Sequence, residues 1–525
     1  MLEAGADSAS ARLDVRLVPA ALSSWLVTAA GIIWPVGTVA ALTCVVLVAF
    51  SGALCWHAAI RQGPQWARTV GVCLLGSGVV GAGFGFAIAL RAEAVDHHPI
   101  TAAFAHAVPV TVTPNESAIS VGHGRLLFRA TLERLADHEM SGRVVVFAPV
   151  TDFGEVMVGQ PVRFTARITR PTRRDLTVAA LTATGRPTMG QAGAVHRAAH
   201  VVRERFAAAA REALPAPQAA MLPALVLGDT SAVTAMTGQE FRAAGLTHLT
   251  AVSGANVTIV CGAVLCCARL IGPRSAVGLA AIALVVFVIV VQPTASVLRA
   301  AVMGAIALLG MLSSRRRQAI PSLSAAVLVL MLAAPQLAVD VGFALSVVAT
   351  AALVVIAPVW SRRMVSRGWP KPLADAVGIA CAAQLVTAPL VAGISGRVSL
   401  VAAAANLAAA PVIAPITVLG TAAATLGMCW PAGAELLIRF TGPELWWVLN
   451  VAHWAAGVPA ASLPVPAGVA GAVVVGVCAV LVVALWRWRW FRAAAGVAVV
   501  CLVAWALSGL LSGASVSAGR DTIVG

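Results

Sequence analysis

Polar side chains that could bind a ligand or react are concentrated in one short stretch of a largely apolar sequence. Twelve consecutive residues contain Thr247, His248, Thr250, Ser253, Asn256 and Thr258. On one continuous helix the threonines share a stripe with Gly254, whereas His248 and Asn256 lie elsewhere around the helix. Polar groups on every side of a membrane helix cannot all face lipid. The segment is therefore expected either to be surrounded by protein and water or to unwind at Ser253-Gly254 and line a cavity.

Two other interpretations of this stretch are open. Small and hydroxylated residues allow membrane helices to pack closely, which would give the threonines a structural role. Alternatively, Ser253 is a nucleophile and His248 its base, as in an intramembrane serine hydrolase. On a continuous helix these two side chains lie about 140° apart, so a dyad needs a break or a second histidine such as His453. Next to Trp454, however, His453 is more typical of an anchor at the membrane surface.

Four ionisable residues extend the candidate region. Arg299 and Asp340 lie near the ends of apolar segments, where they either pair with each other or belong to a functional site. Asp229 and Glu240 precede the first clear apolar span after residue 214, on a segment that we expect to be shallow or re-entrant.

The composition identifies the class of protein that must position these residues. Of the 525 residues, 60% are apolar and 11% are charged, and the mean hydropathy is +0.91. Soluble domains contain roughly 45–50% apolar and about 25% charged residues, so a soluble protein is excluded. All ten cysteines lie in or beside apolar runs and none lies in the polar stretch 91–214. We therefore expect no metal site, no cofactor and no extracytoplasmic disulfide.

Apolar runs of about 20 residues divide the chain into thirteen predicted spans. Three precede the polar stretch (17–34, 36–56 and 69–90), and ten follow it: 247–268, 275–291, 296–312, 319–334, 339–359, 373–393, 399–427, 441–457, 467–486 and 493–511. The run 399–427 contains Pro411 and Pro415, so two half-helices are an alternative there. The predicted fold is a polytopic α-helical membrane protein with four parts: three helices (1–90), a β domain (91–214), a second helical domain (215–511) and a short tail (512–525).

The basic residues predict the orientation in the membrane. The net charge of +15 comes from 36 Lys and Arg against 21 acidic residues, and basic residues collect in cytoplasmic loops. With the N-terminus inside, the inner connections contain Arg61, Arg68, Arg269, Arg274, Arg315 to Arg317, Arg362, Arg363, Arg367, Lys371, Arg439, Arg487, Arg489 and Arg492. The outer connections contain essentially Arg397. This places the protein in the cytoplasmic (inner) membrane, with the β domain and the C-terminus outside.

The stretch 91–214 has the pattern of a small β domain followed by a helix. Apolar and polar residues alternate in 143–147 and 160–168, with turn-forming residues such as Asp152 and Gly154 between them. The domain is mildly basic, and Phe128, Phe147, Phe153 and Phe164 are its candidate stacking residues. An Arg- and Ala-rich helix is predicted from Gly193 to Ala213.

Several motifs, in order over about 200 residues, resemble those of the ComEC proteins, the membrane channels of competence. They are Leu227-Gly228-Asp229, the run from Phe241 to Gly254 with Gly245, His248 and Ser253, and Val297-Leu298-Arg299. Pro335 to Ser346 with Asp340, Gly342 and Phe343, and Asn406-Leu407 before Pro411 and Pro415, complete the match. Two positions differ from the family pattern: Asn256 stands where a second histidine is usual, and Ala344 where a glutamine is common.

The resemblance implies that the protein moves single-stranded DNA through the membrane during natural transformation and is not an enzyme. The implied channel residues are Asp229, Gly245, His248, Ser253, Gly254, Asn256, Arg299, Asp340, Gly342, Phe343, Ser346 and Asn406. An OB-type external domain would contact DNA through Arg163, Arg167, Arg170, Arg173 and Arg174. With no histidine after His453, we expect no metallo-β-lactamase-like nuclease domain.

The implied partners are the strand, the lipid bilayer, and a membrane DNA receptor and a cytoplasmic ATPase or helicase supplied by other proteins, because the chain contains no nucleotide-binding loop. A homo-oligomer is left open. The alternative function is a secondary transporter for a small polar solute with Asp340, Arg299 and the break at Ser253 as its site.

Overall fold

A computed structural model describes residues 14–34, 36–60, 65–292, 294–312, 319–486, 488–490, 493 and 496–497. The chain divides into two compact units. Unit 1 comprises Met1–Ala232, Thr250–Val347 and Ala414–Gly442, and unit 2 comprises Val233–Leu249, Val348–Ile413 and Pro443–Gly525. One boundary between the units, Leu249/Thr250, falls inside the polar stretch identified in the sequence.

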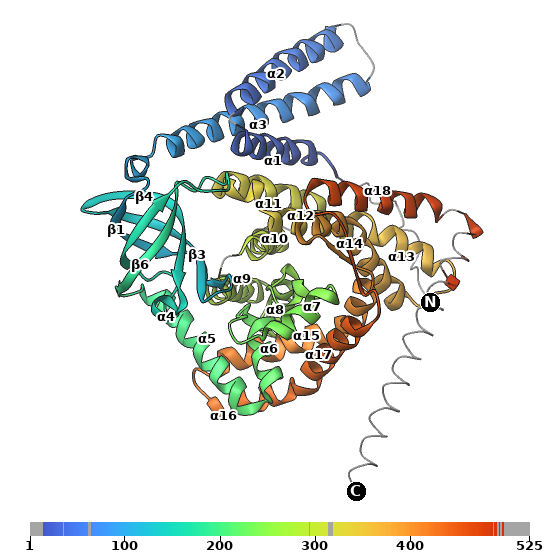
Figure 1. The fold of residues 1–525 in the computed structure, drawn as a ribbon. Coiled ribbons are helices and arrows are strands. Elements are labelled where there is room, and N and C mark those ends of the chain that lie inside the picture. The colour runs from blue at the N-terminus through green and yellow to red at the C-terminus, as the bar shows by residue number, and fades with distance from the viewer. Residues whose placement is uncertain are drawn as a thin grey trace. The chain divides into compact units, whose positions relative to one another are not determined.

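Unit 1 begins with three apolar helices (Figure 1), α1 (Val18–Ile33), α2 (Gly37–Ile60) and α3 (Gln65–Asp96). These are the three predicted front spans. Small residues let the helices approach closely: a Cβ on Gly85 would lie 3.1 Å from Ala41 Cβ, and one on Gly37 would lie 3.2 Å from Ala89 Cβ. The α1 helix is also fixed to the later helices, because Trp25 Nε1 donates to the Ala338 carbonyl at 2.9 Å.

The polar stretch folds as a closed β barrel. Its elements are η1 (Pro99–Ala103), β1 (Ala107–Pro114), β2 (Ile119–Ser120), β3 (Arg125–Leu135), β4 (His138–Pro149), α4 (Val150–Phe153), β5 (Val162–Thr169) and β6 (Ala179–Met189). The strand order β1-β5-β6-β4-β3 closes because β3 also pairs with β1. All pairs in this ring are antiparallel except β4 with β6, which is parallel. Closure leaves these five strands without a free edge.

The alternation along each strand explains the barrel interior. On β5 the even-numbered residues Val162 to Ile168 are buried and the odd-numbered ones are exposed, as expected for a strand with one apolar face. Three of the four phenylalanines considered for stacking, Phe128, Phe153 and Phe164, are at most 4% exposed. They form the hydrophobic core, so a role for these three in stacking on a ligand is wrong. Phe147 alone of the four lies on the outer face, where it is half-buried.

Helices after the barrel complete unit 1. They are α5 (Ala194–Ala213), α6 (Ala216–Leu227), α8 (Gly254–Ala268), α9 (Pro273–Val291), α10 (Ala295–Leu312), α11 (Ala319–Ala333), η3 (Pro335–Val339) and α16 (Pro431–Phe440). The predicted helix 193–213 is α5. The short α6 was not predicted, and its residues from Met221 to Leu227 are all buried. Because twelve residues are too few to cross a bilayer, length alone gave no sign of it.

The predicted single span 247–268 is wrong. Its first part is the 3₁₀ turn η2 (Thr247–Leu249), and α8 begins only at Gly254, with extended backbone at the N-cap residue Ser253. The threonine stripe of a continuous helix therefore does not exist. This break is the unwinding at Ser253-Gly254 that the second of the two predicted outcomes required. That the break lines a cavity stays a prediction. In contrast, the proline-containing run 399–427 is one helix, α15 (Ala402–Leu426), and not two halves.

Unit 2 contains α7 (Ala235–Ala243), η2, α13 (Ala357–Val365), α14 (Lys371–Ser395), β7 (Arg397–Ser399), β8 (Ser462–Pro464) and α18 (Val469–Leu485). Three helices contain residues of both units: α12 (Val341–Val355), α15 and α17 (Gly442–Gly457). The short strands β7 and β8 pair with each other, and α14 packs on α13 and α18. The predicted span 339–359 lies within one apolar helical segment, Val341–Val365, in which α12 and α13 meet at Ile356.

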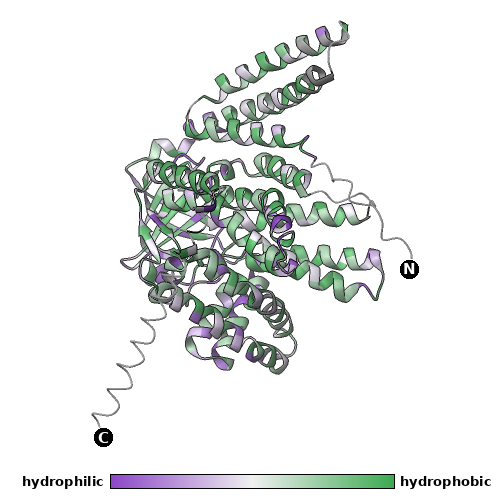
Figure 2. Ribbon diagram, turned by 90° about the vertical axis from the view of Figure 1, so that its right-hand side faces the viewer, coloured by the Kyte–Doolittle hydropathy of each residue, from purple (hydrophilic) through white to green (hydrophobic). Residues whose placement is uncertain are grey.

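Six of the described helical segments are long and apolar enough to cross a membrane: Gly37–His57, Val70–Ala103, Pro273–Val291, Val341–Val365, Lys371–Ser395 and Ala402–Leu426. Six shorter apolar helices accompany them, and most helices are hydrophobic along most of their length (Figure 2). The chain is therefore a helical membrane protein with a small β region. Most of the predicted span 493–511 lies outside the described residues, as do the tail and the basic residues Arg61, Arg315 to Arg317, Arg487 and Arg492.

Candidate functional site

The helix break of unit 1 is held by hydrogen bonds from its polar residues. Asn256, which is 4% exposed, donates through Nδ2 to the Leu225 carbonyl of α6 at 3.0 Å. Ser253 Oγ donates to Asn256 Oδ1 at 3.2 Å. The amide that replaces the usual histidine therefore connects the break to the buried helix α6. Because the hydroxyl of Ser253 bonds to an amide oxygen, this contact provides no base for a serine nucleophile.

Arg299 contacts the start of α8. A Cβ on Gly254 would lie only 2.8 Å from Arg299 Nη2, so the guanidinium lies directly against the first residue of the helix. Arg299 is 6% exposed, and its Nε donates to Ser346 Oγ of α12 at 2.9 Å. Ser346 in turn lies 3.1 Å from Ser296 Oγ. We call Ser253, Gly254, Asn256, Ser296, Arg299 and Ser346 the Arg299 cluster.

Asp340 has a local role that the sequence motif did not reveal. Its Oδ1 accepts the backbone N–H of Phe343 at 2.7 Å, which caps the first turn of α12. Phe343 is fully buried and its ring packs edge-on against Trp25 at 5.4 Å between ring centroids. Arg299 bonds to Ser346 and to Met303 Sδ. Pairing of Arg299 with Asp340, one of the two alternatives, stays a prediction.

A buried arginine that the sequence analysis did not single out fixes the end of α6. Arg203 Nη1 donates to the carbonyls of Leu227 at 2.9 Å and Val290 at 3.3 Å, and Nη2 lies 3.7 Å from Asp229 Oδ2. Burial lowers the pKa of Arg203, and the Asp229 carboxylate partly opposes this shift. Arg203 shares one face of α5 with Ala199, Phe206 and Ala210. A charge in the middle of an apolar helical stripe was the signal that could have identified it.

Asp229 therefore belongs to the same buried region as Asn256. Gly228 is in the left-handed conformation (φ 72°) and ends α6, after which Asp229 Oδ1 accepts both the N–H and the hydroxyl of Ser231. The Leu227-Gly228-Asp229 motif is thus a helix end, stabilised by Arg203 from α5 and preceded by the Leu225 carbonyl that binds Asn256.

The remaining motif residues lie in unit 2. Gly245 has a φ of 72°, and a Cβ there would overlap Ala402. The nearby Ser399 Oγ donates to the Ala243 carbonyl at 2.7 Å, and Asn406 Nδ2 donates to the Ala402 carbonyl at 2.8 Å. Close packing thus explains Gly245, and the Ser399 bond holds the end of α7, just before the turn that leads to the exposed residue His248. The Asn406 bond lies within α15.

His453 contacts Glu240, and not Ser253, in the contact that the structure gives; its side chain is 67% exposed. Its Nδ1 lies 2.8 Å from Glu240 Oε1 of α7, an acidic residue that is 22% exposed in its side chain. The pair connects α17 to the helix that leads into Gly245. Glu240 lies on a short amphipathic helix in unit 2, whereas Asp229 ends a buried helix in unit 1. The shared shallow segment expected for these two residues therefore divides into two separate elements.

The five arginines predicted to contact DNA are exposed, and two of them also contact protein groups. Arg163 and Arg167 lie on the exposed face of β5, and Arg170, Arg173 and Arg174 lie in the exposed loop between β5 and β6. In this loop the Arg170 guanidinium stacks on the Phe104 ring, and Arg174 Nη1 donates to the Ile33 carbonyl at the end of α1 at 3.1 Å.

A second basic surface lies on the outer face of β3 and β4. Arg125 lies over the Phe147 ring at 5.7 Å, and Leu127 pairs with Phe147 across the strands. Arg129 Nη1 bonds to Glu116 at 3.2 Å. Burial lowers the pKa of Arg143 on this face, and the carboxylates of Asp175, Glu116 and Asp340 partly oppose that shift. We call Arg125, Arg129, Arg143 and Phe147 the β3–β4 face.

Comparison with known proteins identifies the helical part of the chain. A family model described as Competence protein matches residues 225–490, about half of the chain. The chain therefore belongs to the competence protein family, whose motifs it resembles in sequence. Membership of this family indicates a role in DNA uptake during transformation. No curated protein and no solved structure gave a significant match.

Proposed function

We propose that the protein conducts single-stranded DNA across the cytoplasmic membrane during natural transformation. The observation that carries this proposal is the junction of a broken helix with a buried arginine, in the region matched by the family. A helix N-terminus carries partial positive charge and points backbone N–H groups outward. Arg299 adds a full positive charge beside the same helix end. Together they favour an anionic group such as a backbone phosphate.

The hydroxyl groups of the cluster suit passage of a chain and not tight capture. Ser253, Ser296 and Ser346 are half-buried and can exchange hydrogen bonds with water or phosphate. Conduction needs contacts that are strong enough for entry and weak enough for release. One cation surrounded by neutral hydroxyls meets this requirement better than a group of several arginines would.

The barrel supports the proposal from the external side of the predicted topology. Five strands in a closed ring with one parallel pair suit an OB-type domain, a fold that binds single strands on one strand face and its flanking loops. On the β3–β4 face, Phe147 is half-buried and offers a ring for stacking, and Arg125 and Arg129 offer charge. We propose this face, with Arg170, Arg173 and Arg174 in the β5–β6 loop, as the entry surface. Contact there is expected to be sequence-independent and salt-sensitive.

We also propose that the protein is a conduit and not a hydrolase, with thirteen spans, a cytoplasmic N-terminus and an extracytoplasmic barrel. The strand receptor and the ATPase or helicase would be separate proteins. The contact of Ser253 with Asn256 supports this proposal, because an amide oxygen is a poor proton acceptor.

The test replaces the buried cation in a transformable host. Arg299→Gln should lower the recovery of a chromosomal marker by roughly a hundredfold, which corresponds to about 2.7 kcal/mol, while the amount of protein in the membrane is unchanged. Arg274→Gln is the matched control, because Arg274 is exposed at the start of α9, and it should transform normally. Ser253→Ala should retain most activity.

Three results would refute the proposal or replace it. Normal transformation by Arg299→Gln would exclude the cluster from conduction. Complete loss in Ser253→Ala, together with labelling of Ser253 by a serine-reactive probe, would indicate a hydrolase. Saturable, gradient-driven uptake of a small solute into vesicles, abolished by Arg299→Gln, would indicate a secondary transporter.

A further inference from the structure

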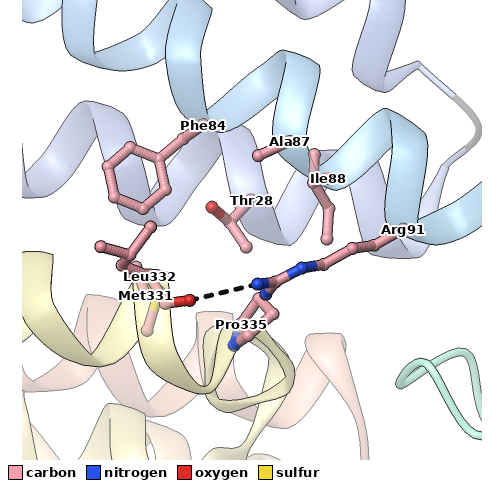
Figure 3. Close-up of a pocket in the computed structure, with 8 residues that line it drawn as sticks. All are labelled: Thr28, Phe84, Ala87, Ile88, Arg91, Met331, Leu332 and Pro335. Carbon is pink, nitrogen blue, oxygen red and sulfur yellow. Dashed lines mark hydrogen bonds between the residues drawn. The ribbon is translucent and has the colours of Figure 1, made fainter.

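A cavity in the first helices of unit 1 contains a buried hydroxyl without a partner. The cavity has a volume of about 20 Å³ and lies between α1, α3 and α11 (Figure 3). Thr28 of α1 lines it and is 1% exposed, and its Oγ1 has no hydrogen-bond partner among the described residues. Hydroxyls on helices commonly donate to a carbonyl in the preceding turn, as Thr43 and Ser77 do on α2 and α3. The Thr28 hydroxyl is thus positioned to donate to a bound acceptor.

Arg91 provides a positive charge at the same cavity. It is the first charged residue after the apolar run that begins at Val70, so it lies where α3 leaves the hydrocarbon core. Its Nη2 donates to the Leu332 carbonyl near the end of α11 at 3.4 Å (Figure 3). The side chain is exposed, and a guanidinium has five N–H donors. Other donors therefore remain for a ligand at the cavity rim.

A second arginine lies at the end of α1. Arg174 of the barrel donates to the Ile33 carbonyl at 3.1 Å and is exposed. Thr28 is five residues before Ile33 and so lies roughly 7–8 Å deeper along the helix. The guanidinium groups of Arg91 and Arg174 are thus near helix ends, and the neutral hydroxyl of Thr28 lies deeper along α1.

The surroundings of these donors are apolar. Phe84, Ile88, Met331 and Leu332 line the cavity, and of these Leu332 is 64% exposed at the surface. In a bilayer the exposed Leu332 side chain contacts acyl chains. A ligand that matches the site carries an anionic group at the level of Arg91, a neutral acceptor at the level of Thr28 and an alkyl chain.

We propose that this site binds an anionic phospholipid. Arg91 donates to the headgroup phosphate, the Thr28 hydroxyl donates to an ester carbonyl, and an acyl chain packs on Leu332 and Phe84 at the cavity. A free phosphate would leave the apolar surface and Thr28 unused. A nucleic acid would place charge at the depth of Thr28, where α1 and α3 are apolar. The bound lipid would fix α1 and α3 against α11.

The test measures lipid retention by the full-length protein. The protein is placed in nanodiscs that contain equal amounts of phosphatidylglycerol and phosphatidylcholine. Native mass spectrometry then releases the protein from the nanodiscs and identifies the lipids that stay bound. The wild type should retain phosphatidylglycerol in preference to phosphatidylcholine. Arg91→Gln should weaken retention roughly tenfold, as for the loss of one charge-assisted hydrogen bond, and Thr28→Val, which keeps the shape, roughly threefold.

Matched variants separate binding from folding. Arg173→Gln removes an exposed charge from the same loop as Arg174, and Thr43→Val removes a hydroxyl that already has an acceptor on α2. Both should retain lipid like the wild type. Arg91→Lys should keep much of the preference. Thermal unfolding in pure phosphatidylcholine should be the same for Thr28→Val and the wild type.

Several outcomes would overturn the proposal. Equal retention of the two lipids by the wild type would exclude a headgroup site, as would wild-type retention by both Arg91→Gln and Thr28→Val. Stabilisation by millimolar inorganic phosphate in phosphatidylcholine nanodiscs would indicate a general anion site. Displacement of phosphatidylglycerol by a dT20 oligonucleotide would indicate a surface for nucleic acid.

Discussion

The barrel and the helices of unit 1 place their charged and apolar side chains in opposite ways. In the barrel, Arg163 and Arg167 are exposed on β5 and Phe153 is fully buried. In the helices, Arg203 and Arg299 are 9% and 6% exposed, whereas Leu42 on α2 is 65% exposed. Exposed charges around an apolar core are typical of a domain in water, whereas buried charges and exposed apolar side chains are typical of helices in lipid.

This difference assigns the two regions different roles in the proposed function. The barrel offers charge on its outside, where contacts are screened by salt. The helices hold charge inside, where each cation bonds to carbonyls or hydroxyls and acts over a short range in a low dielectric. In the proposed function, the barrel would therefore collect the strand and the Arg299 cluster would guide it.

The largest effect is expected from removing a buried charge, compared with removing an exposed charge from the same helix. Arg203→Met leaves the Leu227 and Val290 carbonyls and Asp229 without their partner, so we expect a loss of about 3–5 kcal/mol of stability. Arg205→Met, two residues away and exposed, should change stability by less than about 0.5 kcal/mol. Thermal unfolding of the full chain in detergent measures both. Equal stabilities would contradict the assigned role of Arg203.

An intermediate effect is expected where the helix break meets Arg299. Gly254→Val forces a side chain against the guanidinium, and overpacking of this kind costs about 1–3 kcal/mol. DNA import should fall at least about tenfold, which corresponds to 1.4 kcal/mol. Gly262→Val is the control, because a Cβ at Gly262 on the same helix meets no atom within 4 Å. If both variants import DNA equally well, the close contact has no part in conduction.

The smallest effect is expected on the barrel surface. Phe147→Ala should weaken binding of dT20 to the full-length protein by about fivefold, near the low end of the 1–3 kcal/mol typical of base stacking, because Arg125 partly covers the ring. Its effect on stability should be small, whereas Phe128→Ala in the core should destabilise the protein by about 3–5 kcal/mol. Fluorescence anisotropy at two salt concentrations measures the affinity. Unchanged binding in Phe147→Ala would remove the β3–β4 face from the proposed entry path.

The sequence located most elements of the fold but few of the contacts at the site. Apolar runs predicted the three front helices, α9, α10, α11, α14 and α18, because the length of a membrane helix is set by the thickness of the bilayer. Strand alternation predicted β4 and β5. The helix α6 was missed because it is short and buried in protein, where the bilayer sets no length.

By itself, the sequence determined that the chain is a helical membrane protein with an internal β region. Composition and periodicity indicate this because they reflect whether each residue type is more stable in water or in an apolar environment. The sequence also determined the family, through the motifs from Leu227 to Asn406. Only the tertiary structure decided that Ser253 bonds to Asn256, that Arg203 holds the end of α6 and that Asp340 caps α12. These partners are distant in sequence or depend on backbone geometry at a helix end, and hydrophobic periodicity carries no information about either.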